Sequence, residues 1–472
     1  MNRRSRALFA VCAAAFLAFL DTTIVNVSFP NIAAHFPQAS RSDLSWVLDA
    51  YFIVIAAFLV PAGQLADRVG RKRVFLFSIN AFVGTSLVCA LAPTWQVLVA
   101  ARVLQGIAAA VIAPVSMALL LPEFPAERRS QGVGIWGAAA ALAAASGPVL
   151  GGLLVEAADW RLIFLVNLPI GLLIVLVGRG ALIESRDDHA AEAGLPDLIG
   201  AGAAVVGLGA LAMAIVEGQS WGWGSPRIVG TFVVAAVLVG VLVRRCLTHP
   251  NPVVDPALLR VPSFRWGSLG TFLFSVAFFS MILGNILFLT GVWHYSILEA
   301  GLAVAPGPLA STIVAAPAGR LADRFGHRVL IVPGTLFYSV GLLVLRTTGA
   351  QPDYVGTWLP GQVLVGIGIG LAFPTFGAAA VQHVRPDRFG SASAVTSAFR
   401  QFGAVVGTAT VIAIIGNPTT LAQALDVSDE AYAFGVVAGL LSGVAALALR
   451  PTRPVGQRND GAEREMIDAP AR

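Results

Sequence analysis

Four charged residues stand inside long apolar runs of this chain: Asp21, Asp49, Arg102 and Arg400. A charged side chain at the centre of a bilayer costs at least about 2.5 kcal/mol, so a carboxylate there requires a partner, water or a proton. An arginine keeps its proton under biological conditions and acts as a fixed cation that favours the charged form of a nearby carboxylate. We therefore expect a reversible proton site at Asp21 or Asp49, with Arg102 as its electrostatic switch. The alternative is that Asp49 reaches the membrane interface and Arg102 only braces helices.

The depths of these residues support a shared site. Counting about 1.5 Å per helical residue, Asp21 lies about 9 Å below the outer face of its apolar run, Asp49 about 6 Å and Arg102 about 10 Å. Thr22 and Asn26 lie within about one helical turn of Asp21 and are expected to line the same cavity.

Arg400, with Gln401 beside it, lies about 15 Å into its own apolar run, which places it near the middle of the membrane. We expect both side chains to face a cavity and to contact substrate. The alternative is that Arg400 pairs with a backbone carbonyl group.

The composition indicates that helices in a membrane must position these residues. The chain has 472 residues, is 57% hydrophobic and only 12% charged, and has a mean hydropathy of +0.79. Soluble proteins carry about twice that share of charge. Fourteen runs are long enough for a bilayer core of about 30 Å. They are 7–29, 45–66, 74–92, 95–120, 132–155, 161–178, 197–216, 227–246, 266–290, 300–319, 329–348, 357–381, 390–415 and 431–449.

The positions of lysine and arginine predict the orientation. Most of the 31 basic residues fall on one side, namely at the N-terminus, in alternate loops and in the C-terminal tail. Loops that stay in the cytoplasm carry the excess of positive charge. Both termini are therefore expected on the cytoplasmic side of a plasma membrane.

One loop sequence occurs twice. The segment Gly63-Gln-Leu-Ala-Asp-Arg-Val-Gly-Arg-Lys72 matches Gly319-Arg-Leu-Ala-Asp-Arg-Phe-Gly-His-Arg328 at six of ten positions. This indicates two similar halves that start from the same membrane face. We therefore divide the chain into an N-terminal six-helix bundle (1–183), a linker with two inserted helices (184–260), a C-terminal six-helix bundle (261–450) and a disordered cytoplasmic tail (451–472).

The chain resembles the major facilitator superfamily, in particular its fourteen-helix drug:proton antiporter branch. Five segments carry the resemblance in the right order, and it extends over nearly the whole chain. They are Leu20-Asp-Thr-Thr-Ile-Val-Asn-Val-Ser-Phe-Pro30, the loop 63–73, Arg102-Val-Leu-Gln-Gly106, Gly147-Pro-Val-Leu-Gly-Gly152 and the segment 159–171. The resemblance implies two bundles around a central cavity that rock between inward-open and outward-open states, with Arg102 as the proton switch.

Two of these motifs are predicted to control movement. By resemblance, the first loop with its counterpart in the second half acts as a gate between the bundles, through Gly63, Asp67, Arg68, Gly70, Arg71, Asp323 and Arg324. Its alternative is a solvated charged turn. Gly147 and Gly151 allow a neighbouring helix to approach closely, and Pro148 bends the span. The order Gly-Pro-x-x-Gly-Gly, which ends at Gly152, resembles the exporters of the family and is the main indication of direction.

The combined prediction is proton-coupled efflux of small amphipathic or cationic organic molecules, such as drugs, antibiotics or secondary metabolites, by a monomer that needs no cofactor, metal or nucleic acid. The alternatives are an importer or lipid flippase on the same scaffold, and Na⁺ in place of H⁺ as the coupling ion. A membrane-embedded enzyme or sensor is disfavoured, because the sequence contains no Walker loop, HExxH or GxSxG motif.

Overall fold

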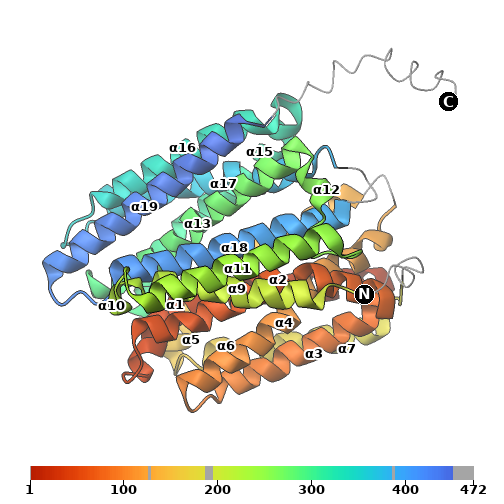
Figure 1. The fold of residues 1–472 in the computed structure, drawn as a ribbon, viewed down its shortest axis with the longest axis horizontal. Coiled ribbons are helices and arrows are strands. Elements are labelled where there is room, and N and C mark those ends of the chain that lie inside the picture. Colours follow the sequence, from red (N-terminus) through yellow and green to blue (C-terminus); the bar gives the residue numbers. More distant parts are fainter. Residues whose placement is uncertain (1, 126–128, 187–194, 385–388, 450–472) are drawn as a thin grey trace.

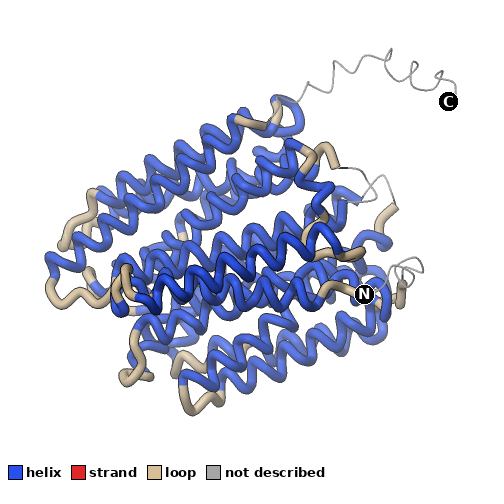
Figure 2. Tube along the Cα trace, in the orientation of Figure 1, coloured by secondary structure: helices blue, strands red, loops and turns tan. Residues whose placement is uncertain are grey.

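The computed structural model describes residues 2–125, 129–186, 195–384 and 389–449, and these residues form helices joined by short turns, with no strand among them (Figure 2). The predicted disordered tail, 451–472, lies outside the described residues, as do residues 187–194 of the linker that begins at residue 184.

The N-terminal half consists of α1 (Arg3–His35), α2 (Arg41–Val69), α3 (Arg71–Ala90), α4 (Trp95–Leu120) with the short η1 (Leu121–Glu123), α5 (Arg129–Ala157), α6 (Leu162–Leu165) and α7 (Asn167–Ala181). The inserted pair consists of α9 (Leu198–Val216) and α11 (Pro226–Thr248), with the short α10 (Gly218–Trp221) between them. The C-terminal half consists of α12 (Pro256–Leu259), α13 (Pro262–Gly291), α14 (Ile297–Val304), α15 (Pro306–Phe325), α16 (His327–Arg346), η3 (Tyr354–Trp358), α17 (Leu359–Val381), α18 (Phe389–Ile415) and α19 (Leu421–Leu447).

The number of spans agrees with the prediction of fourteen. Among the described residues, thirteen helices are long and apolar enough to cross a bilayer, and α5 makes a fourteenth when its two parts are taken together. These parts, Ile135–Ala144 and Ser146–Ala157, meet at an angle of 42°, just before Pro148. A proline inside a helix removes one backbone donor and crowds the preceding turn, which favours such a bend.

The last span differs from its prediction. It was expected to begin at residue 431, but α19 begins at Leu421, with the hydroxyl of Thr420 accepting a hydrogen bond from the backbone N–H of Gln423 at 3.2 Å. The extra turns carry polar residues, and Asp429 pairs there with Arg346 of α16. Hydropathy locates the apolar part of a helix, whereas capping and ion pairs decide how far the helix extends beyond it.

The helices lie side by side along one direction, with the inserted pair beside the two halves (Figure 1). The inserted helix α9 contacts both α2 and α18, while α11 packs on α9. Arg245 of α11 binds the buried carboxylate of Asp197, the N-cap of α9, at 2.7 Å. The inserted pair therefore covers one line of contact between the halves.

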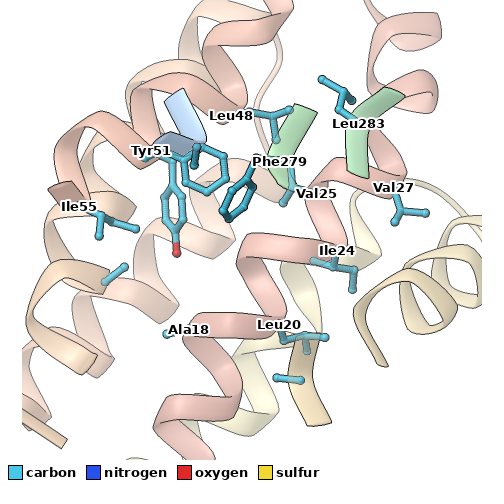
Figure 3. Packing of buried hydrophobic residues seen from close by; sticks show 14 of the residues in the cluster. Ala18, Leu20, Ile24, Val25, Val27, Leu48, Tyr51, Ile55, Phe279 and Leu283 are labelled. Carbon is cyan, nitrogen blue, oxygen red and sulfur yellow. The ribbon is translucent and has the colours of Figure 1, made fainter. Parts of the chain in front are cut away.

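The two halves meet along two seams. In the α2–α18 seam, α2 packs against α18, and in the α5–α14 seam, α5 packs against α14. Between them the apolar core is continuous, and Figure 3 shows Val25 and Leu48 of the N-terminal half gathered near Phe279 and Leu283 of the C-terminal half. We call the end that holds the N-terminus and the turns at Gly70 and Gly326 the basic end. The end that holds His35 and Asp159 is the distal end.

Candidate functional site

Asp21 and Arg102 form an ion pair in the interior of the N-terminal half. Both side chains are buried, and Arg102 Nη1 lies 2.6 Å from Asp21 Oδ2. The other carboxylate oxygen, Asp21 Oδ1, accepts hydrogen bonds from Gln105 Nε2 at 3.2 Å and from Asn167 Nδ2 at 3.1 Å. Three donors on α4 and α7 thus hold a carboxylate that α1 supplies. A buried carboxylate is stable in its charged form only with such a set of partners.

The guanidinium group of Arg102 is held as firmly as the carboxylate. Its Nε donates to the carbonyl oxygen of Val47 on α2 at 3.0 Å, and its Nη1 also donates to Gln105 Oε1 at 2.7 Å. Its centre lies 3.7 Å from the ring centroid of Tyr51, a distance at which an aromatic face stabilises a cation. Ser86 of α3 completes the network by accepting from Gln105 Nε2 at 2.6 Å. Five helices, α1, α2, α3, α4 and α7, therefore contribute to the network around one buried charge pair.

Sequence reasoning did not identify Gln105, Asn167 or Ser86 as members of this network. Gln105 follows Arg102 by three residues, and this spacing places both side chains on the same helix face. Asn167 is a polar residue in an otherwise apolar span and donates both to Asp21 and to Ser86. A search for polar residues at helical spacing around the two charges would have found Gln105. The position of Asn167 required the packing of α7.

Asp49 lies apart from this pair, although the sequence grouped all three residues. The carbonyl group of Val47 and the ring of Tyr51 face Arg102 from α2, whereas the Asp49 carboxylate contacts the hydroxyl of Thr408 on α18. Asp49 is 1% exposed, and its Oδ2 atom has no hydrogen-bond partner. The structure therefore brings Asp21 and Arg102 together and places Asp49 in the α2–α18 seam.

The predicted cavity residues lie on α1 and α18, and Arg400 makes a contact between these two helices. Asn26 is buried, donates to the carbonyl oxygen of Thr22 at 2.8 Å and leaves its Oδ1 without a partner. The guanidinium group of the half-buried Arg400 on α18 lies 5.6 Å from the ring centroid of Phe19 on α1. This contact joins the two halves. Within the described part of the chain, Arg400 makes no hydrogen bond or ion pair, and Gln401 Oε1 is also unpartnered. Asn26 Oδ1 and Gln401 Oε1 are therefore buried polar atoms that the described residues leave without a hydrogen-bond partner.

The loop between α2 and α3 is fastened within the N-terminal half. Asp67 Oδ1 lies 2.7 Å from Arg71 Nε, and the carboxylate of Glu184 accepts from the backbone N–H of Lys72 at 3.0 Å and of Arg73 at 3.2 Å. An acidic group at a helix N-terminus satisfies free N–H groups and the helix dipole. Glu184, which follows α7, is thus the N-terminal anchor of α3, a role that the sequence did not indicate.

The matching turn in the second half has the same backbone form. Gly70 has φ +123° and Gly326 has φ +95°, and each donates its N–H to the carbonyl four residues earlier, at 3.0 Å and 2.8 Å. Arg324 beside this turn is exposed, and its guanidinium group lies 5.2 Å from the ring centroid of Phe325. The side chain of Asp323 lies outside the described residues. Glycine is required at both turns because other residues rarely adopt such φ values.

Replacing Gly70 by alanine is expected to lower the free energy of unfolding by about 1–3 kcal/mol. The backbone would be strained, and the new Cβ would lie 2.8 Å from Glu184 Oε1. Thermal unfolding of the purified protein measures this effect. The matched control is Gly63→Ala in the same motif, whose Cβ would meet Pro114 Cβ at an ordinary 3.9 Å. Equal stability of the two variants would show that the turn does not depend on Gly70.

The glycines of α5 lie at contacts with two different helices. A Cβ on Gly147 would lie 2.0 Å from Thr23 Oγ1, and one on Gly151 would lie 3.0 Å from Ile24 Cγ1, both on α1. A Cβ on Gly152 would instead lie 2.6 Å from the Cα atom of Leu298 on α14. Reciprocally, a Cβ on Gly301 of α14 would lie 2.4 Å from the carbonyl oxygen of Pro148. The segment therefore joins α5 to α1 and also forms the α5–α14 seam between the halves.

Other contacts between the halves lie near the distal end. The backbone N–H of Leu298 donates to Glu156 Oε1 at 3.3 Å, and Arg41 Nη1 donates to the carbonyl oxygen of Gly416 at 2.9 Å. Both contacts join residues that flank the distal ends of spans. At this end, the two halves are therefore held together by polar contacts as well as by close packing at glycines.

The sequence of this chain is similar to those of known proteins. The family model described as Major Facilitator Superfamily matches residues 11–408 and 267–470. A Multidrug resistance protein Stp from Mycobacterium tuberculosis is 34% identical over 421 residues, which cover 88% of this chain and 76% of that protein. A Methylenomycin A resistance protein from Streptomyces coelicolor is 32% identical over 441 residues, which cover 93% and 91%.

A solved structure shares the fold at low sequence identity. A bacterial homolog of the human lysosomal transporter Spinster, in an inward-facing and unoccupied conformation, aligns with a TM-score of 0.63 and 16% identity, over 95% of this chain and 98% of that one. At this identity the likeness concerns the fold alone.

Proposed function

This chain belongs to the major facilitator superfamily, and from that premise we propose that it exports small amphipathic or cationic organic molecules across the plasma membrane in exchange for protons. It is a transporter and not an enzyme, with a small-molecule substrate. Both relatives named above are resistance proteins, and their similarity extends over most of each chain. They support drugs, antibiotics or secondary metabolites as the substrates of this chain.

The observation that carries proton coupling is the buried Asp21–Arg102 pair. Both side chains are buried, and one added proton would neutralise the carboxylate while Arg102 keeps its charge. A neutral Asp21 would leave Arg102 as an unbalanced cation, which strongly favours rearrangement. Protonation of Asp21 can therefore shift the equilibrium between two transport states.

The cycle we propose has two half-steps. With the cavity open to the outside, the embedded carboxyl group binds a proton and substrate leaves. With the cavity open to the cytoplasm, the proton leaves and substrate binds, so that substrate moves out as protons move in. Thr22, Asn26, Arg400 and Gln401 are proposed to contact the substrate, because Asn26, Arg400 and Gln401 offer polar atoms that the fold leaves unused.

We further propose that the basic end faces the cytoplasm and that the protein acts as a monomer. In this orientation the loop 63–73 and its counterpart at Asp323 and Arg324 lie on the cytoplasmic side, where they gate the inner opening. The distal contacts of Gly152 and Arg41 then close the outer opening.

Expression in a host that lacks its own pumps tests this function directly. We expect resistance to at least one class of compound in a broad panel, and loss of that resistance when an uncoupler collapses the proton gradient. The matched control is Asp21→Asn, which keeps the size of the side chain and removes the charge. Resistance that survives the uncoupler would rule out a proton gradient as the energy source.

An importer or a lipid flippase is the second candidate on the same scaffold. Inverted membrane vesicles with an imposed proton gradient distinguish the directions, since an exporter accumulates its substrate inside such vesicles. Replacing the proton gradient by a sodium gradient in the same assay identifies the coupling ion. Accumulation with sodium alone would assign Na⁺ to the cycle in place of H⁺.

A further inference from the structure

A cavity of about 290 Å³ lies between the two halves at the distal end, and we call it the distal pocket. Arg41, at the start of α2, is the lining residue that comes from the N-terminal half. The rest of the lining belongs to the C-terminal half: the end of α13 and the residues after it, the end of α18, the turn 418–420 and the first turns of α19. Sites for small molecules begin at about 300 Å³, so the distal pocket has the volume of a small one.

Two basic side chains line the distal pocket, one from each half. Arg41 Nη1 donates to the carbonyl oxygen of Gly416 at 2.9 Å, which leaves most of the N–H donors of this guanidinium group unused. His294, after the end of α13, is exposed. Neither Arg41 nor His294 forms an ion pair within the described part of the chain. The distal pocket therefore has an excess of positive charge.

The acidic residues near this end do not balance that charge. Asp43, close to Arg41 on α2, belongs to the helix cap and accepts a hydrogen bond from the backbone N–H of Ser40 at 3.0 Å. On α19, residues three or four apart line the pocket, namely Leu421, Ala424, Val427 and Ser428. At about 100° per residue, Asp426 lies on the opposite face of that helix. Asp429 pairs with Arg346 of α16.

The backbone of His294 has an unusual conformation. Its φ is +54°, and the other positions of positive φ among the described residues are all glycines. Glycine would adopt this conformation without strain, yet the chain has an imidazole there. Strained residues of this kind concentrate at sites that bind ligands. The outlier therefore indicates that the His294 side chain is needed at the distal pocket.

The remaining walls are partly apolar, with contributions from Leu287, Val292 and Ile415. Arg41 stands four residues before the apolar run that begins at residue 45, and the pocket residues of α19 end before its apolar run begins at residue 431. The distal pocket therefore lies at the level of lipid headgroups and the adjacent water. Basic groups beside an apolar wall suit an anionic group that is attached to an apolar body.

We propose that the distal pocket binds an amphipathic anion, a phosphate or carboxylate group on an apolar body, with Arg41 and His294 as its cationic contacts. Such groups are the usual partners of arginine. Because Arg41 and His294 belong to different halves, the anion contacts both only while the distal end is closed. A ligand favours the state to which it binds more tightly, so the bound anion stabilises the closed distal end.

This site is separate from the proposed substrate contacts, since Arg400 precedes Ile415 by 15 residues, or about 22 Å along α18. An acidic membrane lipid and a dissolved organic anion share the chemistry that the distal pocket recognises. The binding does not depend on the proposed transport function, whereas its effect on the transport cycle does.

Thermal unfolding of the purified protein in neutral detergent tests the binding, with butyl phosphate as the dissolved probe and sodium chloride at equal ionic strength as the reference. A ligand that binds the folded state raises the unfolding midpoint with its concentration. Arg41→Gln should weaken the apparent affinity by about tenfold or more, because hydrogen bonds to a charged group are lost. The matched control is Arg227→Gln, an exposed arginine in the first turn of α11, which should respond like the wild type.

Nanodiscs distinguish the two sources of the anion. A higher midpoint in phosphatidylglycerol than in phosphatidylcholine, dependent on Arg41, would assign the site to a lipid headgroup. A response to butyl phosphate alone would assign it to a dissolved anion. No response to either probe in the wild type, or an equal loss in Arg41→Gln and Arg227→Gln, would overturn the proposal.

The His294→Asn variant supplies a second test, in case Arg41→Gln does not fold. Asparagine tolerates the left-handed backbone conformation, so the turn is kept while the imidazole is removed. The affinity for the same probe should fall severalfold. An unchanged response in this variant would contradict the role of His294 in the distal pocket.

A third measurement separates this inference from the proposed function. Single cysteines introduced at the distal end should react more slowly when the anion is bound, and equal reactivity with and without it would reject stabilisation of the closed state. An Arg41-dependent response together with no efflux of any compound supports the distal pocket and rejects the exporter. Proton-driven efflux with no response to either anion supports the exporter and rejects this site.

Discussion

Replacing Arg102 by alanine is expected to abolish proton-coupled efflux and to lower the free energy of unfolding by about 3–5 kcal/mol, because removal of one partner of a buried ion pair leaves an uncompensated charge. Asp21 would keep Gln105 and Asn167 as donors, but neither residue carries a charge. The energy follows from denaturation of the purified protein, and the coupling from uptake into inverted vesicles. The two readouts are independent because stability is measured without a gradient.

The double variant Asp21→Asn with Arg102→Gln tests whether the ion pair only stabilises the fold or also couples efflux to protons. It removes both charges, so most of the lost stability should return while efflux stays absent. The matched control is Arg245→Ala in the inserted pair, which breaks the bond to the buried Asp197. This control should lose stability and keep its coupling per folded molecule. Full coupling in the double variant would assign the pair a purely structural role.

Replacing Gly152 by alanine is expected to prevent closure of the distal end. The added Cβ would lie 2.6 Å from the Cα atom of Leu298 and 3.0 Å from the carbonyl oxygen of Ile297, and both are backbone atoms that no side-chain rotation can move. Overpacking of this kind costs about 1–3 kcal/mol. A change of about 1.4 kcal/mol is tenfold in an equilibrium constant, so the distal-closed state should lose about one to two orders of magnitude in population.

Efflux by Gly152→Ala and the reactivity of single cysteines introduced at the distal end measure this change together. Efflux should fall while distal cysteines become more reactive. The matched control is Gly137→Ala on the same helix, where a Cβ meets nothing within 4 Å. That variant should transport normally and gain slightly in helix stability, by about 0.5–1 kcal/mol. Normal efflux in Gly152→Ala would show that the α5–α14 seam does not tighten during transport.

The sequence alone was sufficient to predict the spans and the family resemblance. A bilayer imposes a minimum apolar length on each helix, so runs of hydrophobic residues locate the spans without any knowledge of their neighbours. The repeated loops around Gly70 and Gly326 were equally visible, since a left-handed turn requires glycine at one fixed position. Where polar residues extend a helix, as in α19 from Leu421, the same rule placed the start too late.

The partners of each charge were decided only by the tertiary structure. Hydropathy and depth are properties of position along one helix, and they placed Asp21, Asp49 and Arg102 at one level. Successive helical residues point about 100° apart, so the side chains of Tyr51 and Asp49 leave α2 in different directions, one toward Arg102 and the other toward Thr408. The rotation of α2, which the packing of α4, α9 and α18 around it sets, is what separates the two carboxylates.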